Sequence, residues 1–300
     1  MKCFYHDDRD GQCCSFWVSR FYHYHPALEL ISLSTKDKFP IDTIKSGETV
    51  YIVDYSIAPD MMKELLKKAF VVWIDHHIGA IDDYKNFPHD IEGIRYNGIS
   101  GCELTWIYLY KLMDKSKEQI SLMDMEKLRN QVPLMTRLIG DFDTWQWKFG
   151  MKTRIFTAGL DTYDTDPRSE IWTRMVESDD ISFVEEKGNL IIQYETNQFN
   201  KAIKKYAYYT TFEGHKAIAC NSTFFTSLLF DGVKNAPDLK IVHCHDGVRH
   251  KVSLYSDTVS VVNIAKKYGG NGHKGAAGFN IEQLPFTFEG KYIPEDEKCS

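Results

Sequence analysis

Long apolar runs are missing from this sequence. No stretch approaches the roughly 20 residues that a membrane-spanning helix needs. The first residues, MKCFYHDDRDG, turn polar and charged at the sixth position and lack the apolar stretch of a signal peptide. Internal repeats and low-complexity segments are also missing, and the apolar content of 43% is too high for a disordered chain. We therefore expect a globular protein without a membrane span.

Cysteine pairs and excess positive charge are missing as well. The seven cysteines are odd in number, scattered and without a CxxC pair, which predicts reduced thiols, a cytoplasmic location and no structural zinc site. The formal net charge of −6 argues against a protein that coats a long nucleic-acid duplex with a basic surface. It permits a short phosphorylated substrate held at a local site or by a metal. The sequence does not fix the oligomeric state, and a homodimer is compatible with it.

The first half of the chain alternates strand-like and helix-like segments. Apolar, β-branched runs such as TVYIVDYS at 49–56 and FVVWIDHH at 70–77 predict buried strands. Pro59 suits the first turn of a helix, and Ser100 suits an N-cap. This alternation predicts an α/β fold with a mostly parallel sheet covered by helices on both faces. The strands are predicted at 2–6, 28–34, 49–56 and 70–77, and the helices at about 11–24, from Pro59, at 100–113 and at 124–139.

The second half has a different pattern. Residues 161–181 are acidic and polar, and the next segment, up to residue 206, reads as one long helix. Strands are predicted at 216–220, 239–245 and 248–256, with Asp246-Gly247 as a hairpin turn, and a short helix is predicted at 260–269. We therefore predict four regions: an N-terminal domain at 1–180, a connector helix at 181–206, a smaller α/β domain at 207–285 and a loose polar tail at 286–300.

Acids and histidines follow apolar runs in four places. Ligands of open parallel sheets bind beyond the carboxyl ends of the strands, so these side chains are expected to converge. Mixed carboxylate and imidazole ligands suit a pair of divalent ions and favour Mn²⁺ over Ca²⁺. Two such ions can clamp a phosphoryl oxygen and activate a water. The four clusters are His6, Asp8 and Asp10, which would point to one side of an extended segment; Asp54; Asp75, His76 and His77; and Asp141 with Asp143.

These clusters resemble the motifs of the DHH phosphoesterase superfamily, with HxDxD at 6–10, VDYS at 53–56, DHH at 75–77 and GD at 140–141. The run GGNGHKGAAGF at 269–279 is similar to the signature of the DHHA1 domain that often follows. By size and order the chain resembles the small nano-RNase and pAp-phosphatase group, which is related to RecJ-type exonucleases. The resemblance implies a DHH domain, a connector helix and a DHHA1 domain, with the catalytic cleft between the two domains.

The resemblance also implies a set of metal ligands. Asp54 would bridge two ions, which are expected to be Mn²⁺, with Mg²⁺ or Co²⁺ as alternatives. For the fourth motif, Asp143 competes with Asp141, and we prefer Asp141 because it directly follows the strand-like run PLMTRLI. The implied ligands are His6, Asp8, Asp10, Asp54, His76 and Asp141.

Two further motif residues would act without binding metal. The resemblance implies that His77 lies near the scissile phosphate, where it polarises the phosphate or protonates the leaving oxygen. Asp75 would orient a neighbouring histidine. We therefore expect His77 and Asp75 to contribute to catalysis.

The residues expected to bind substrate are Ser100, Gly270, Gly272, His273, Arg249 and Tyr255. Ser100 either caps a helix or meets a phosphate together with the helix amides. The glycines would let a phosphate approach the backbone, and His273 would bind the non-scissile end. Relatives commonly have an arginine where Tyr255 stands. Arg249 or Lys251 could supply that charge, or Tyr255 could stack on a base. The run HCHD at 243–246 is interpreted as a strand entering a hairpin rather than as a metal site.

The leading functional prediction is a Mn²⁺-dependent phosphodiesterase that hydrolyses very short oligonucleotides to mononucleotides. Alternatives with the same chemistry are a phosphodiesterase for cyclic dinucleotides, a phosphatase for 3′-phosphoadenosine 5′-phosphate (pAp) and a longer-range single-strand exonuclease. A different class is an inactive nucleotide-binding sensor, which the presence of every motif acid and histidine argues against. We expect no long duplex and no membrane among the partners.

Overall fold

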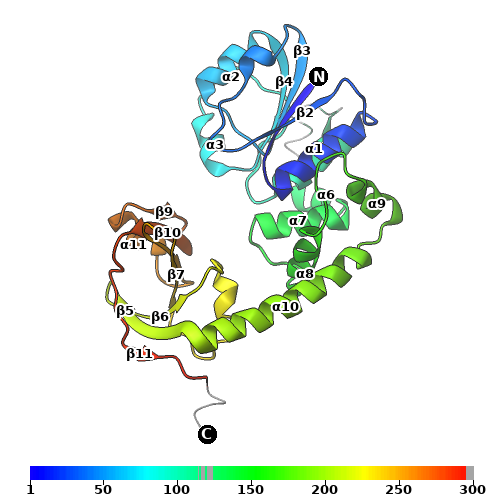
Figure 1. The fold of residues 1–300 in the computed structure, drawn as a ribbon. Coiled ribbons are helices and arrows are strands. Elements are labelled where there is room, and N and C mark those ends of the chain that lie inside the picture. Colours follow the sequence, from blue (N-terminus) through cyan, green and yellow to red (C-terminus); the bar gives the residue numbers. More distant parts are fainter. Residues whose placement is uncertain (114, 116–118, 120–123, 295–300) are drawn as a thin grey trace. The chain divides into compact units, whose positions relative to one another are not determined.

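The structure is a computed structural model that describes residues 1–113, 115, 119 and 124–294 (Figure 1). The chain divides into two compact units, residues 1–191 and 192–300. The division falls inside helix α10 (Ser182–Tyr206), which corresponds to the helix predicted at 181–206.

Unit 1 contains a four-stranded sheet in which every pair of strands is parallel, in the order β2-β1-β3-β4. Helix α1 (Arg9–Phe21) connects β1 to β2, and α2 (Pro59–Leu66) connects β3 to β4. These helices lie on opposite faces of the sheet (Figure 1). The predicted α/β class with a parallel sheet is confirmed. The strands are β1 (Lys2–His6), β2 (Glu29–Leu33), β3 (Glu48–Val53) and β4 (Ala69–Ile74).

The two faces of this sheet form two cores, because successive side chains of a strand point in opposite directions. On β3, Val50 and Ile52 pack with Met62 of α2. Tyr51 and Val53 pack on the other face, in a core shared with α1 and the later helices. Both faces are covered, which explains why the strands are continuous apolar runs.

Further helices of unit 1 follow the sheet. The single helix predicted at 124–139 is wrong, because it is interrupted at Pro133, which cannot donate a hydrogen bond inside a helix. The second part runs on to Asp143, so the fourth motif lies on a helix and not at a strand end. The remaining elements are the 3₁₀ turn η1 (Ile41–Thr43), α3 (Ile78–Asp83), α4 (Gly101–Ile107), the π-helix η2 (Tyr108–Leu112), α6 (Met125–Arg129), α7 (Leu134–Asp143), α8 (Met151–Leu160) and α9 (Glu170–Ser178).

The N-terminal part of α10 packs closely on α8. A Cβ atom on Gly159 would collide with the carbonyl of Val184, and a Cβ atom on Gly188 would collide with the carbonyl of Ile155. The two glycines therefore permit direct backbone contact between the helices. Further along α10, Phe199 belongs to a core of unit 2.

Unit 2 contains a mixed sheet in the order β11-β5-β6-β7-β8-β10-β9, with β6 and β7 as its parallel pair. The predicted strands at 216–220, 239–245 and 248–256, the turn at Asp246-Gly247 and the helix at 260–269 are all present. The elements are β5 (Ala207–Phe212), β6 (His215–Asn221), the 3₁₀ turn η3 (Ser227–Phe230), β7 (Leu239–His245), β8 (His250–Tyr255), α11 (Val261–Lys267), β9 (Asn271–Gly272), β10 (Ala276–Ile281) and β11 (Gly290–Lys291).

The predicted loose tail at 286–300 needs correction. Gly290 and Lys291 form β11 and pair with β5, and Phe286 and Tyr292 are buried. This segment closes the edge of the unit 2 sheet; residues 295–300 lie outside the described part of the chain. Among the described residues, no helix is both long enough and apolar enough to cross a bilayer.

Candidate metal centre

Asp54 lies at the middle of the acid and histidine cluster. It follows β3 directly, in a left-handed backbone conformation with φ of 52°, and its amide donates to the carbonyl of Ile74 at 2.9 Å. The carboxylate is 2% exposed, and its Oδ1 is 3.1 Å from Nε2 of His76. That oxygen accepts no hydrogen bond from any residue that the structure describes. A buried, charged carboxylate oxygen without a donor is costly, so a cation beside it would stabilise it.

The first motif supplies three side chains from the end of β1 and the start of α1. Asp8 is the N-cap of α1; it accepts from the amide of Gly11 at 2.9 Å and contacts Nδ1 of His6 at 2.5 Å. Asp10 is in the first helical turn, so the expected extended HxDxD segment is wrong. The three side chains nevertheless belong to the cluster, because the chain turns from strand to helix at this point.

Asp10 is held by the start of another helix. Its two carboxylate oxygens accept from the amides of Gly101 and Cys102, at 2.7 and 2.9 Å, at the N-terminus of α4. Its Oδ2 also lies 3.8 Å from Nε2 of His76. The helix amides therefore fix the orientation of this carboxylate toward the cluster.

The expectation that Ser100 binds substrate is wrong. Ser100 is fully buried and caps α4, where its hydroxyl accepts from the amide of Glu103 at 3.4 Å. The amides that a phosphate would need already bind Asp10. Ser100 is a helix cap, and α4 acts on the site through Asp10.

Asp141, the preferred acid of the fourth motif, does not face the cluster, whereas the competing Asp143 does. Residues two apart on an α-helix point about 200° apart, so these two acids cannot face the same way. Asp143 Oδ2 is 3.5 Å from Nε2 of His76. Asp141 is fully buried and accepts from the amides of Lys148 and Phe149, at 2.7 and 3.2 Å, and from the hydroxyl of Thr153. Asp141 fastens the loop after α7.

The DHH motif follows β4. Asp75 is fully buried, and its Oδ1 accepts from Nδ1 of His77 at 2.7 Å and from the amides of His76 and His77. Its Oδ2 accepts from Ser56 and from Trp73 Nε1. Asp75 therefore holds the His77 ring by one nitrogen and leaves the other nitrogen, Nε2, available. Half of the His77 side chain is exposed, whereas His76 faces the acids.

The charges of the cluster are not balanced by its own residues. Burial, followed by repulsion from Asp10 and Asp8, raises the pKa of Asp54 well above its usual value. The same causes raise the pKa of Asp143 to about 8. Burial lowers the pKa of His76, whereas the hydrogen bond that His6 donates to Asp8 raises the pKa of His6. A divalent cation would relieve this repulsion between carboxylates, so the side chains present fit a metal site.

Three groups of side chains have the spacing of metal ligands, with ligand atoms within 4.8 Å of one another. Asp54 belongs to two of them, and His76 also belongs to two. This sharing is what a bridging carboxylate between two neighbouring ions requires. The groups are Asp54, His76 and His77; His6, Asp8 and Asp54; and Asp10, His76 and Asp143.

In unit 2 the structure brings most of the expected substrate residues to one end of the sheet. Tyr255 pairs with Ala276, and the amide of His273 donates to the carbonyl of Ala276 at 2.7 Å. Gly270 and Gly272 have a structural role of their own. A Cβ atom on either residue would collide with β10, and Gly272 has a φ of 148°.

Arg249 does not belong to this group. It precedes β8, whereas Tyr255 ends it, and six residues of strand span about 20 Å. Its amide donates to the Asp246 side chain in the hairpin turn. The expectation that Arg249 supplies charge beside Tyr255 is therefore wrong.

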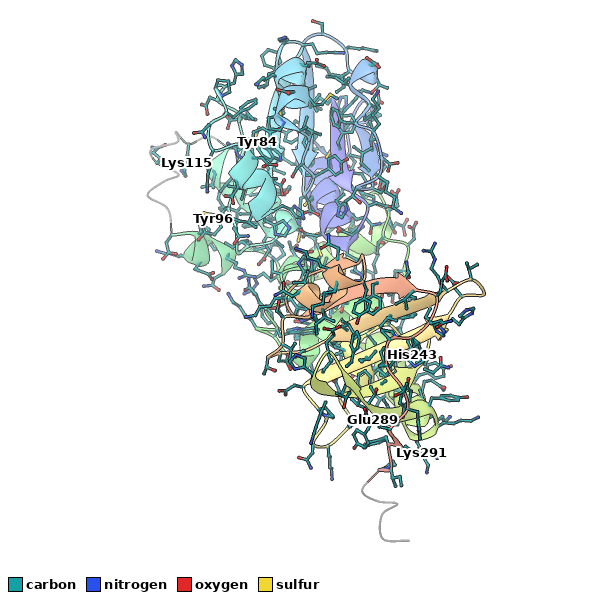
Figure 2. All side chains as sticks on the ribbon, turned by 90° about the vertical axis from the view of Figure 1, so that its left-hand side faces the viewer. Tyr84, Tyr96, Lys115, His243, Glu289 and Lys291 are labelled. Carbon is teal, nitrogen blue, oxygen red and sulfur yellow. The ribbon has the colours of Figure 1, made fainter. Side chains whose placement is uncertain are left out.

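A cavity missed by the sequence reasoning opens beside the metal cluster. Its volume is about 410 Å³, and it lies between the segment after β3 and helix α3. Tyr55 lines the cavity and directly follows Asp54 in the VDYS motif. The position of this tyrosine beside a motif acid was therefore a sequence signal for the cavity. Tyr84, labelled in Figure 2, lines it from the end of α3.

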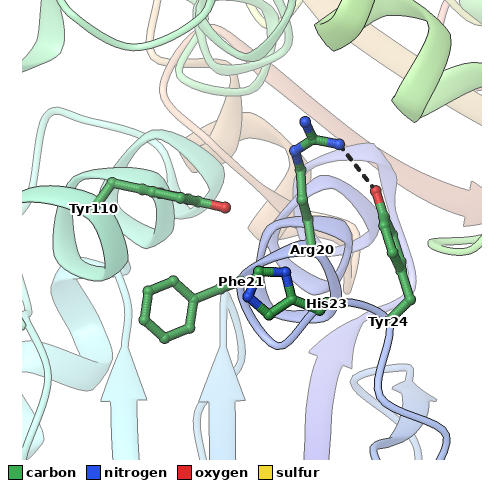
Figure 3. Close-up of a pocket in the computed structure, with 5 residues that line it drawn as sticks. All are labelled: Arg20, Phe21, His23, Tyr24 and Tyr110. Carbon is green, nitrogen blue, oxygen red and sulfur yellow. Dashed lines mark hydrogen bonds between the residues drawn. The ribbon is translucent and has the colours of Figure 1, made fainter.

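Another pocket lies at the opposite end of α1, roughly 17 Å along the helix from Asp10. Arg20, Phe21, His23, Tyr24 and Tyr110 line it, and Arg20 donates to the Tyr24 hydroxyl at 3.2 Å (Figure 3). It contains none of the cluster's acids, whereas Asp54 lines the first cavity.

No family model matches the sequence. An uncharacterised protein, R106, of Acanthamoeba polyphaga mimivirus is 23% identical over 250 residues, which cover 79% of this chain and 54% of that protein. This chain thus spans about half the length of that relative.

Several solved structures are similar over almost the whole chain. A pGpG-specific phosphodiesterase from Vibrio cholerae is 14% identical with a TM-score of 0.46, covering 94% of this chain and 93% of its own. A RecJ exonuclease bound to manganese is 14% identical with a TM-score of 0.48, covering 93% and 85%.

Proposed function

We propose that this chain is a two-metal phosphodiesterase of the DHH/DHHA1 superfamily that hydrolyses very short oligonucleotides to mononucleotides with Mn²⁺. The observation that supports it most strongly is the buried Oδ1 of Asp54, which lacks a hydrogen-bond donor among the described residues and lies 3.1 Å from His76. A carboxylate in this condition, surrounded by further acids, is stable beside cations. The proposed ligands are His6, Asp8, Asp10, Asp54, His76 and Asp143.

The residues of the chain would divide the work. Divalent ions at this cluster would supply an activated water and neutralise charge on the phosphoryl oxygens. His77 would act with Nε2, donating a hydrogen bond to a phosphate oxygen or a proton to the leaving oxygen. Asp75 is a positioning residue, because its hydrogen bond to Nδ1 fixes both the ring orientation and the tautomer. The amides at the start of α4 would keep the Asp10 carboxylate oriented toward the ions.

Unit 2 would contact the remainder of the substrate. We propose that Gly270, Gly272 and His273 bind its non-scissile end, with Tyr255 stacking on a base. The net charge of −6 supports a short substrate over a long duplex. The six described cysteines are all unpaired, which supports a cytoplasmic location.

The test is product analysis by chromatography. The protein with Mn²⁺ is incubated with RNA and DNA dinucleotides, a pentanucleotide, pAp, cyclic di-AMP, cyclic di-GMP and pyrophosphate, and an Asp54→Ala variant serves as the control. Cleavage of the linear dinucleotides, lost in the variant, is the expected result. Preferential opening of a cyclic dinucleotide or release of phosphate from pAp would replace the proposed substrate. Binding without turnover of any compound would contradict the enzymatic proposal.

A further inference from the structure

The cavity of about 410 Å³ beside the metal cluster has the size of a small-molecule site. It lies wholly within unit 1. Three of its lining residues, His6, Asp54 and His77, also belong to the cluster or the DHH motif, so the cavity begins at the proposed reaction centre. The other lining residues are Thr35, Tyr55, Ser56, Ile57, Ala58, Ala80, Asp83 and Tyr84.

The cavity wall after β3 is held in place by two aromatic side chains. Trp73 Nε1 donates to the carbonyl of Tyr55 at 3.0 Å, and the Tyr84 hydroxyl donates to the carbonyl of Ile57 at 2.7 Å. The rings of Trp73 and Tyr84 pack with centroids 4.4 Å apart. The segment that carries Tyr55 is therefore fixed before any ligand arrives, which reduces the entropy lost on binding.

The charge of the lining restricts what can enter. Apart from the three residues shared with the reaction centre, the lining contains one acidic side chain, that of Asp83. No lysine or arginine lines the cavity. Away from His6 and His77, a phosphate inside it would meet no cationic side chain of the lining and would face this carboxylate. A neutral group with hydroxyls and a flat ring fits better, since Tyr55 offers an aromatic ring while Asp83 and Thr35 offer hydrogen-bonding oxygens.

We propose that this cavity binds the nucleoside on one side of the scissile phosphate, and that it accepts this nucleoside only without a terminal phosphate. The inference rests on the proposed function and specifies its substrate class: short oligonucleotides with an unphosphorylated end. Tyr55 stacks on the base, and Asp83 accepts hydrogen bonds from sugar hydroxyls. The cavity thereby selects against polyphosphate chains and against nucleotides that carry a second phosphate on the bound sugar.

The first experiment compares ApA, pApA and ApAp as substrates of the full chain with Mn²⁺. One of the two phosphorylated dinucleotides is expected to have a kcat/KM at least about tenfold below that of ApA, because its extra phosphate meets the Asp83 carboxylate and no lysine or arginine of the lining. Asp83→Lys is expected to remove most of this difference. The matched control is Asp82→Lys, which makes the same charge change at the neighbouring residue, outside the lining and paired with Lys85.

A second pair of variants tests the stacking. Tyr55→Ala is expected to raise KM for ApA by about 5- to 150-fold, the range of one lost base–aromatic contact, whereas Tyr55→Phe keeps the ring and changes KM little. The rise in melting temperature on adding Mn²⁺ reports whether the metal cluster is intact in both variants.

The outcomes separate this inference from the proposed function. Equal kcat/KM values for the three dinucleotides, or a discrimination that Asp83→Lys leaves unchanged, would overturn the inference while the phosphodiesterase activity stands. Failure of the unmodified protein to hydrolyse any of the three, although Mn²⁺ binds, would overturn both.

Discussion

Histidines of the two units lie in opposite environments. In unit 1, His6 and His77 each contact a carboxylate, at 2.5 and 2.7 Å, and these hydrogen bonds raise the pKa of both imidazoles. In unit 2, His243 is 5% exposed on the sheet (Figure 2). Burial and the neighbouring His250 lower its pKa to about 4. A hydrogen bond to a carboxylate raises the pKa of a histidine ring, whereas burial lowers it, as it does for His243 and also for His76.

The presence of neighbouring carboxylates also distinguishes the candidate metal site of unit 1 from the buried His243 of unit 2. Every group with metal-ligand spacing among the described residues lies in unit 1, where carboxylates share the space. His243 instead contacts the Tyr208 hydroxyl at 2.9 Å and the ring of Phe286. The strand-and-hairpin interpretation of residues 243–246 agrees with this environment.

The largest effect is expected from removing the central acid of unit 1. Asp54→Asn should lower kcat by at least about 10³-fold, because the two proposed ions would lose their shared ligand. The metal-free protein should gain about 1 kcal/mol of stability, since one buried negative charge disappears. Activity assays and thermal melts in chelator measure the two effects. Asp7→Asn is the control, because Asp7 is a nearby exposed acid that binds Ser32. If the Asp54→Asn variant stays active, the proposal that unit 1 holds the catalytic metal site is contradicted.

The next effect separates the two acids of α7. Asp143→Asn should weaken Mn²⁺ binding by about 10- to 100-fold and leave the fold intact. Asp141→Asn should lower the free energy of unfolding by about 1–3 kcal/mol, because Asp141 accepts two hydrogen bonds from the loop after α7 and one from Thr153 of α8. Titration calorimetry and urea denaturation measure these quantities. The reverse pattern would restore Asp141 as the ligand.

Unit 2 is tested through the pH dependence of stability. The pKa of His243 falls from 6.5 to about 4 on folding, so its stabilising contribution is complete above pH 6.5 and is lost as the pH falls toward 4. At pH 5 the loss amounts to about 2 kcal/mol. His243→Gln cannot titrate and should flatten the change in unfolding free energy between pH 7.5 and 5. The exposed neighbour His245 is the control, and a slope unaffected by His243→Gln would contradict the assignment.

The smallest effect is expected at the hairpin end of unit 2. Arg249→Ala should change kcat/KM for a dinucleotide by less than about threefold, because an exposed charge far from the glycine-rich segment contributes little. His273→Ala measured beside it should have the larger effect. Equal losses in both variants would return Arg249 to the substrate site.

The sequence allowed good predictions wherever a pattern was local. The parallel strands of unit 1 were predictable because β-branched apolar runs match strands buried on both faces. The acids after them were predictable because parallel strands end at one edge. In contrast, which acid of the fourth motif faces the cluster depends on where each residue lies around helix α7, and the position of Asp141 directly after PLMTRLI carried no information about that.

The remaining errors involve partners far apart in the chain. The amides of Gly101 and Cys102 bind Asp10, more than 90 positions earlier, so Ser100 could not be recognised as a cap alone. Likewise, β11 pairs with β5 across about 80 residues, and its own composition resembles a loop. Hydrophobic periodicity carries no information about such pairings.

Helix α10 has a consequence for anyone who wishes to express the units separately. Its first turns are in backbone contact with α8 through Gly159 and Gly188, and Phe199 contributes to a core of unit 2. A gene cut at the boundary between residues 191 and 192 would leave both products with half a helix and an uncovered apolar face. Each fragment would have to carry its own copy of residues 182–206, because each unit needs part of this helix to complete its packing.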